Sequence, residues 1–315
     1  MASVLRHTAP PPANLPVALA RVLAELLDGA APVPSRCVPL DEAAGAMLAA
    51  PLVVPAPVPA RAVALRRGYA VASADTLGAS PYSPLPLPAV PALVEAGDTL
   101  PAGCDAVLPE DTVLITGALA EAQDSASPGL WARRIGEDAP AGAVLRGAGE
   151  TVRALDVAIA GNAGVTSCEI RRPRLLILPG GPATAAAVRL VAALAGAAGT
   201  EVRTHDAPDL AEADLVLAFD RRALEQQDAR VVAPRLALRP GEDGAVLRLG
   251  ETPALLMPDR LADALGVWLA LGLPLVRALA GAAQAKSEER RLTRKISSVV
   301  GVAELALLRI DGGSA

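Results

Sequence analysis

The chain has 315 residues, a length that favours two or three domains over one. Hydrophobic residues make up 52% and charged residues 20%, so a sizeable core can be buried and general disorder is excluded. The formal net charge of −5 argues against a nucleic-acid-binding surface, which needs basic residues to neutralise phosphates. Only 2% of the residues are aromatic, so Ala, Val and Leu must fill the core.

The three cysteines, Cys37, Cys104 and Cys168, lie far apart and form no CxxC pair. This spacing favours buried or half-buried thiols over a zinc site or a disulfide framework. No apolar signal core precedes the prolines at 10–12, and Arg, Asp, Gly or Pro interrupts the longest apolar stretches. We therefore expect no signal peptide, no membrane span and a cytoplasmic location.

The N-terminal part of the chain predicts one helix, one short helix and an extended segment. Residues 1–13, with three consecutive prolines, are expected to be disordered. A helix capped by Asn14 is expected to end at Gly29. A second, short helix over about 41–50 is followed by a Pro-rich extended segment over 51–60.

The middle of the chain has the pattern of a β-rich domain, and the next part has that of an α/β domain. Over 61–149, short apolar runs are separated by Gly and Pro turns at close spacing. After Pro173, the apolar run 174–178 is typical of a strand buried on both faces. Strands then alternate with helices, which predicts a doubly wound, mainly parallel sheet over 173–281. Residues 286–315 begin with basic residues and contain one strand, which is too little for a domain.

Three sequence stretches carry a family resemblance. They read VPLDEAAGAMLA (38–49) with RGYAV (67–71), then GDTLPAGCDAVLPEDT (97–112), then GEDAPAG (136–142) with GNAG (161–164) and RPRLLIL (172–178). In this order and spacing they resemble the molybdopterin molybdenumtransferases, the family of bacterial MoeA and the gephyrin E domain.

The resemblance implies an α/β fold with a β-rich second domain. An elongated N-terminal linking region would comprise 14–60 and 150–172, beside the β-rich domain 61–149. A three-layer α/β/α molybdopterin-binding-like domain would span 173–281, and 286–315 would be the start of a truncated C-terminal β-barrel domain. The family acts as a homodimer and inserts molybdenum from molybdate into adenylylated molybdopterin, using magnesium.

The polar residues of the family's site are largely absent. Where the family has Asp-Asn-Ser-Ala-Met-Asp-Gly-Tyr, this chain reads AVALRRGY over 62–69, with Arg67 in place of the second Asp. Divalent cations take oxygen ligands, so this change reverses the charge where a cation would be handled. The acidic pair after the first α/β strand is missing as well, and Asp259 replaces a glycine in the last loop. We expect no metal site.

A few site positions still match the family. Glu137 aligns with its catalytic glutamate, although a solvated turn carboxylate is the favoured interpretation because its partners are missing. Gly180 and Gly181 are candidates for binding an anionic substrate, or they form a plain strand-to-helix turn. Asp206 aligns with an acidic residue of the α/β domain, and Arg239 keeps one of two cations or is a surface residue.

Three functions remain open. The first, which we favour, is a catalytically degenerate MoeA-like protein that serves as a binding or scaffold partner in molybdenum-cofactor biosynthesis or delivery. Its partners would be a molybdoenzyme or a competent paralogue, beside a second copy of itself, and not nucleic acid or membrane. The second is an active transferase with a rebuilt site, for which molybdopterin, molybdate and Mg²⁺ would be needed. The third is recruitment of the fold for an unrelated small ligand. The first is favoured because the losses concentrate at polar site positions, while scaffold residues such as Gly68, Gly97 and Gly136 persist.

Overall fold

The computed structural model describes residues 16–205, 213–225, 229–283, 296 and 299–308. These residues form two compact units. The α/β unit takes in the described residues up to Ala50, 148–153, and those from Cys168 on. The β-rich unit consists of 51–147 and 154–167. The expected disordered segment 1–13, the Asn14 cap and most of 286–315 lie outside the described residues.

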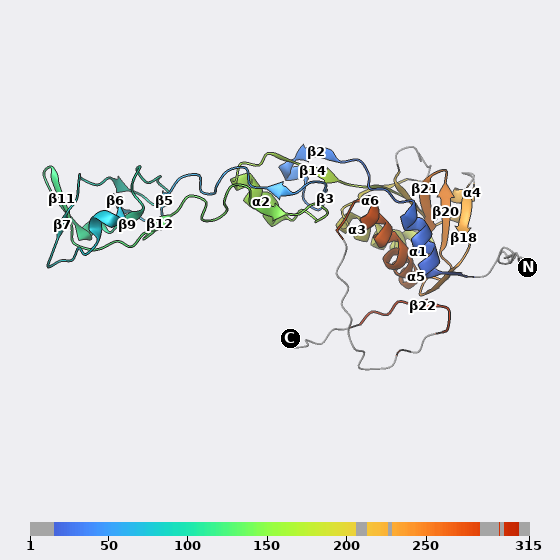
Figure 1. Ribbon diagram of the computed structural model, residues 1–315. Helices are drawn as coiled ribbons and strands as arrows, with labels where there is room; N and C mark the ends of the chain where they lie inside the picture. Colours follow the sequence, from blue (N-terminus) through green and yellow to red (C-terminus); the bar gives the residue numbers. More distant parts are fainter. Residues whose placement is uncertain (1–15, 206–212, 226–228, 284–295, 297–298, 309–315) are drawn as a thin grey trace, which may run out of the picture. The chain divides into compact units, whose positions relative to one another are not determined.

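The α/β unit is built on a six-stranded sheet in the order β16-β15-β17-β21-β20-β18 (Figure 1). The strands are β15 (Arg174–Leu178), β16 (Glu201–Thr204), β17 (Leu215–Ala218), β18 (Arg230–Ala233), β20 (Ala245–Leu249) and β21 (Thr252–Leu256). The first four strands in the spatial order run parallel, and β20 runs antiparallel to both of its neighbours, β21 and β18. In β17 every residue is buried, as expected of a strand that is covered on both faces.

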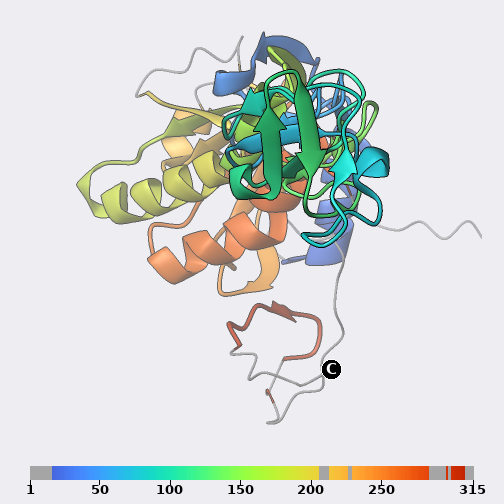
Figure 2. The same ribbon diagram turned by 90° about the vertical axis from the view of Figure 1, so that its left-hand side faces the viewer.

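Helices cover one face of this sheet and form the larger core. They are α1 (Leu19–Asp28), α3 (Ala185–Ala197), α5 (Leu261–Val267), a π-helical turn (Trp268–Gly272) and α6 (Leu273–Leu279). Figures 1 and 2 show α3 and α5 side by side on this face. Leu175, Ile177, Leu215 and Leu217 meet these helices, and the fully buried Trp268 lies in the same cluster.

The opposite face of the sheet carries the alternate side chains of the same strands. Leu176, Leu178 and Val216 pack there, together with Leu224 of α4 (Arg221–Glu225). The switch from one core to the other along each strand follows from the period of two in a β-strand.

The helical run Leu261–Leu279 is long and apolar enough to cross a membrane by length and composition alone. Half of its most apolar window is buried inside the structure, and Trp268, Leu271 and Leu275 contribute to the main core. We therefore describe it as a core helix.

Two small sheets complete the α/β unit. One has the order β2-β14-β3, formed by β2 (Arg36–Pro39), β14 (Ser167–Arg171) and β3 (Met47–Leu48). The other has the order β1-β19-β22, formed by β1 (Val17–Ala18), β19 (Leu236–Arg239) and β22 (Ala303–Glu304).

The short helix expected over 41–50 was wrong. Only a 3₁₀ turn, Leu40–Glu42, forms there, and Met47–Leu48 is the strand β3. Gly45 has φ +80°, which ends any helix at that point. The backbone N–H of Leu48 donates to the Glu150 carbonyl instead of to a helical partner. Tertiary pairing therefore overrides the local helical pattern.

The β-rich unit consists of short strands in small sheets. Two sheets have three strands, in the orders β8-β6-β9 and β10-β11-β7, and two have the pairs β5-β12 and β4-β13. The strands are β4 (Leu52–Val53), β5 (Val63–Ala64), β6 (Gly68–Val71), β7 (Leu85–Pro86), β8 (Leu93–Val94), β9 (Ala106–Leu108), β10 (Val113–Thr116), β11 (Leu119–Ala122), β12 (Ala132–Arg133) and β13 (Val144–Arg146). Figure 2 shows the β10–β11 hairpin in front. Helix α2 (Ala154–Asn162) also belongs to this unit and contacts β13.

Close backbone approach explains one of the glycines in this unit. A Cβ on Gly68 would lie 2.3 Å from the Leu108 carbonyl oxygen across the β6–β9 pair. Any larger residue would push these strands apart. The glycine is therefore required by packing, whatever chemistry its neighbours carry.

A matched pair of Leu→Ala variants tests the core of the α/β unit. Leu217→Ala removes a fully buried side chain of the central strand and is expected to lower the free energy of unfolding by about 3 kcal/mol. Leu261→Ala removes a side chain that is 50% exposed and is expected to change it by less than about 0.5 kcal/mol. Urea unfolding followed by far-ultraviolet circular dichroism, which reports mainly the helices of the α/β unit, measures both. Equal effects of the two substitutions would contradict the described core.

Candidate functional site

A two-stranded ladder in the β-rich unit pairs the strand that precedes Arg67 with the strand that precedes Glu137. β5 pairs antiparallel with β12, with Ala64 opposite Ala132 and Val63 opposite Arg133. The N–H of Leu65 donates to the Trp131 carbonyl oxygen at 2.8 Å, which extends the pairing by one residue. Because the strands are antiparallel, the chain leaves the ladder toward Arg67 at one end and toward Glu137 at the other, so the ladder does not bring these two residues together.

The two faces of this ladder differ in character. Ala64 and Ala132 are buried beneath it. Leu65 and Trp131 are about half exposed, and the Arg66 guanidinium lies 5.1 Å from the centre of the Trp131 ring. Trp131 has φ +52°, a left-handed conformation that is uncommon for residues other than glycine. An apolar and cationic surface thus stands where the family resemblance would place polar and acidic side chains.

Arg67 is held between two glutamates. Its Nε donates to Glu110 Oε1 at 2.7 Å, and an Nη donates to the Glu95 carboxylate. The hydrogen bond to Glu110, and then the negative charge of that residue, raise the pKa of Arg67 above its ordinary value. Both carboxylates are therefore engaged by a fixed cation of the protein.

Sequence reasoning singled out Arg67 but missed Glu95 and Glu110. They lie 28 and 43 residues further along the chain, in segments with no motif that links them to Arg67. Glu95 is placed by the turn after β8, and Glu110 by a 3₁₀ turn (Glu110–Thr112) after β9. The sequence carries no signal for these partners, because an exposed arginine is solvated by water and needs no acidic partner.

Glu137 closes a turn in this structure. Its Oε2 accepts a hydrogen bond from the backbone N–H of Arg134 at 2.7 Å, and the side chain is exposed. The neighbouring Asp138 pairs with Arg133 at 3.2 Å. The Glu137 carboxylate thus makes a local contact, to a residue three positions away in the sequence.

The second predicted site lies at the carboxyl edge of the parallel sheet. The chain goes from β15 to β16 on one side and then to β17 on the other, so the strand order reverses between β15 and β17. Ligands of open α/β sheets bind at such a reversal. Gly180 and Gly181 follow β15 there, and a Cβ on Gly180 would lie 2.5 Å from the Phe219 carbonyl oxygen.

The polar groups of this glycine turn are largely bonded to one another. The Gly180 N–H donates to Thr184 Oγ1 at 3.2 Å, and that hydroxyl donates to the Gly181 carbonyl oxygen at 2.9 Å. Pro179 and Pro182 have no N–H to offer. The turn is therefore a poorer cradle for a phosphate than an unobstructed helix start would be.

The remaining predicted residues are not gathered into one site. Arg239 ends β19, outside the six-stranded sheet, and its half-exposed side chain lies 3.9 Å from Glu242. Asp206 lies outside the described residues. Glu137 belongs to the β-rich unit, whereas the glycines and Arg239 belong to the α/β unit.

Neither predicted site offers a set of metal ligands. Within the part of the chain that the structure describes, no three His, Cys, Asp or Glu side chains group closely enough to hold a metal ion. The residues present therefore do not fit a divalent cation held by several carboxylates.

The expectation of buried or half-buried thiols was wrong for one cysteine. Cys37 is exposed, whereas Cys104 and Cys168 are half-buried. Cys37 neighbours Val38, whose side chain is buried, and successive residues of a strand point to opposite faces.

Comparisons with known proteins identify relatives of this chain. The family model of the MoeA N-terminal region, domains I and II, matches residues 13–164. Molybdopterin molybdenumtransferase 2 of Mycobacterium tuberculosis (strain CDC 1551 / Oshkosh) is 25% identical over 304 residues, covering 78% of this chain and 74% of its own length. Two crystal structures of molybdopterin biosynthesis MoeA proteins from Pyrococcus horikoshii superpose with TM-scores of 0.68 and 0.64. They are 20% and 21% identical, and the matches cover 85% of this chain and 81% and 80% of those chains, so the fold is shared.

A matched pair of Gly→Ala variants tests the glycine turn. Gly180→Ala is expected to destabilise the α/β unit by about 2 kcal/mol, because the new methyl group meets the Phe219 carbonyl. Gly196→Ala, in α3 with open space around it, is expected to stabilise by about 0.5 kcal/mol. Urea unfolding measures both. A neutral Gly180→Ala would show that the turn is not packed as described.

The Arg67 pairs should respond to salt. Arg67→Ala leaves the Glu95 and Glu110 carboxylates without their shared cation, so the melting temperature should fall at low ionic strength. The difference from the unmodified chain should shrink in 1 M NaCl, where exposed charges are screened. Arg61→Ala is the control, since the described residues show no ion pair for it. A loss for Arg67→Ala that salt leaves unchanged would refute an electrostatic role.

Proposed function

We propose that this chain, which belongs to the MoeA family, is a catalytically degenerate member that acts as a binding or scaffold partner in molybdenum-cofactor biosynthesis or delivery. Family membership supports a role in molybdenum-cofactor biosynthesis at the level of the family. The loss of catalysis and the scaffold role rest on the site's own residues.

One observation carries the proposal, and it is the pairing of Arg67 with Glu95 and Glu110. A guanidinium fixed at this place disfavours a divalent cation through like-charge repulsion, which solvent and the two paired carboxylates reduce. The two carboxylates nearest to this position are already paired, so they are poor candidates for replacing the missing ligands.

The support for retained binding is the preserved framework. At Gly68 and at Gly180, an added Cβ would lie within 2.5 Å of a backbone carbonyl oxygen, so no larger residue fits there. The parallel sheet and its strand reversal are intact, while the acidic residues around them are replaced. Function resides in sites that are placed on a fold, so a protein can keep its fold after it has lost its catalytic residues.

The proposal has three further parts, which come from the family resemblance and from the sequence. The chain works in the cytoplasm, it forms a homodimer, and its other partner is a molybdoenzyme or a catalytically competent paralogue. Cofactor delivery requires contact with one of these two, because a protein without insertion activity must receive or pass on a ligand made elsewhere.

Complementation tests the loss of catalysis. The unmodified chain, expressed in a strain that lacks its own molybdenumtransferase, is expected not to restore molybdoenzyme activity at ordinary molybdate concentrations. A competent MoeA protein serves as the positive control, and an immunoblot shows that the chain is present. Restoration of activity would establish an active transferase with a rebuilt site.

A single reversal of charge is expected to be insufficient. Arg67→Asp frees Glu95 and Glu110, but Ala62, Pro182 and Asp259 still replace residues of the family's site. The same complementation assay should therefore remain negative for this variant. Activity gained by Arg67→Asp alone would show that Arg67 is the sole block and that the rest of the site is competent.

A further inference from the structure

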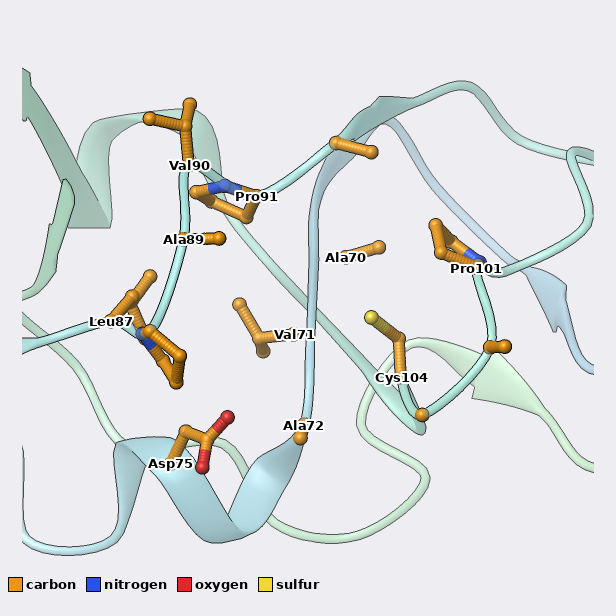
Figure 3. A pocket seen from close by; sticks show the side chains of 14 residues that line it. Ala70, Val71, Ala72, Asp75, Leu87, Ala89, Val90, Pro91, Pro101 and Cys104 are labelled. Atoms are coloured by element: carbon orange, nitrogen blue, oxygen red, sulfur yellow. The ribbon is translucent and has the colours of Figure 1, made fainter. Parts of the chain in front are cut away.

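The β-rich unit contains a cavity that the proposed function does not use. It has a volume of about 380 Å³, within the range of small-molecule pockets. Figure 3 shows strand β6 between two walls, with Leu87, Ala89, Val90 and Pro91 on one side and Pro101 and Cys104 on the other. Asp75 closes the lower edge.

The base of the cavity is fixed by hydrogen bonds. The 3₁₀ turn Ser73–Thr76 carries Asp75, and Asp105 holds it by accepting bonds from the N–H and the hydroxyl of Ser73 at 2.7 and 2.8 Å. The hydroxyl of Thr76 accepts from the Ala126 N–H at 2.9 Å. Asp75 is therefore presented by a rigid support, although its own side chain is exposed.

The walls offer few hydrogen-bond donors. Pro88, Pro91 and Pro101 have no N–H. Several other backbone N–H groups of the lining are already used, since those of Ala70, Asp75, Leu87 and Cys104 donate to the carbonyls of Ala92, Ala72, Ala120 and Pro101. A ligand that needs to accept hydrogen bonds would find little here.

The side chains that line the cavity are apolar, except for those of Asp75 and Cys104. Of the 14 lining residues, all of which the structure describes, Asp75 alone is charged. Cys104 is the other polar group, and burial raises the pKa of its thiol, followed by the negative charges of Asp105 and Asp75. The thiol thus stays protonated at neutral pH and leaves a single negative charge beside an apolar surface.

We propose that this cavity binds a small ligand with an apolar body and one ammonium group, the ammonium facing Asp75. The apolar body packs on Val71, Leu87 and the proline wall, where its burial contributes most of the affinity. The ammonium donates to the Asp75 carboxylate, which can only accept when ionised. The inference is independent of the proposed role in the molybdenum cofactor.

Three probes of similar size and different charge test this site at pH 7. Calorimetry with the full chain is expected to show saturable binding of benzylamine, which is protonated at this pH, and weaker binding of benzyl alcohol and benzoate. The proposal is overturned if benzylamine does not bind, or if the alcohol or the benzoate binds as tightly.

The Cys104 thiol reports where the probe binds. Saturating benzylamine is expected to slow alkylation of Cys104 by iodoacetamide, measured by mass spectrometry, because it fills the space in front of the thiol. Cys37, which is exposed in the other unit, should react at an unchanged rate. Binding that leaves the Cys104 rate unchanged places the probe elsewhere and refutes the site.

Matched variants test the role of the carboxylate. Asp75→Asn keeps the shape of the side chain and is expected to weaken benzylamine binding about fivefold, the scale of an exposed charge pair, while benzyl alcohol is unaffected. Asp111→Asn, an exposed carboxylate of the same unit that does not line the cavity, should change neither. The assignment is overturned if Asp75→Asn binds benzylamine as tightly as the unmodified chain does and melts at the same temperature.

Discussion

The short β5–β12 ladder decides what the β-rich unit can do. Each of its strands has two residues, and because they are antiparallel the chain leaves toward Arg67 at one end and toward Glu137 at the other. Its buried side holds Ala64 and Ala132 and belongs to the core, so the ladder persists whatever its exposed side carries. Chemistry at this place depends entirely on which side chains the ladder presents. Here it presents Leu65, Arg66 and Trp131.

The charge of Arg67 is paired within the β-rich unit. An arginine where an aspartate is expected would be an unbalanced change, but Glu95 and Glu110 balance it from two other loops. Such exposed pairs contribute little to stability, so their main consequence is to occupy carboxylates that could otherwise take a cation. The same is seen in the α/β unit, where Thr184 engages the polar groups of the glycine turn. In both units, therefore, polar groups at a predicted site are bonded within the unit itself.

The sequence predicted the features that depend on long apolar runs and failed where a partner is distant. The run LLIL in β15 identified a buried parallel strand, because it is short and flanked by prolines, which favours a strand over a buried helix. The helix expected over 41–50 failed because pairing with Glu150 and β14 is not visible locally. β19 could not be separated from the main sheet by pattern alone, since Leu236–Arg239 is as apolar as its neighbours. The partners of Arg67 were missed for the same reason, and the cavity beside Asp75 required the placement of three separate loops.

The most direct test of the degenerate-site account is calorimetric titration of the chain with adenylylated molybdopterin in the presence of Mg²⁺ and molybdate, followed by assay of the same sample for molybdenum bound to the dithiolene. The account predicts heat of binding and no inserted molybdenum. Inserted molybdenum above the level of a sample without protein would contradict it.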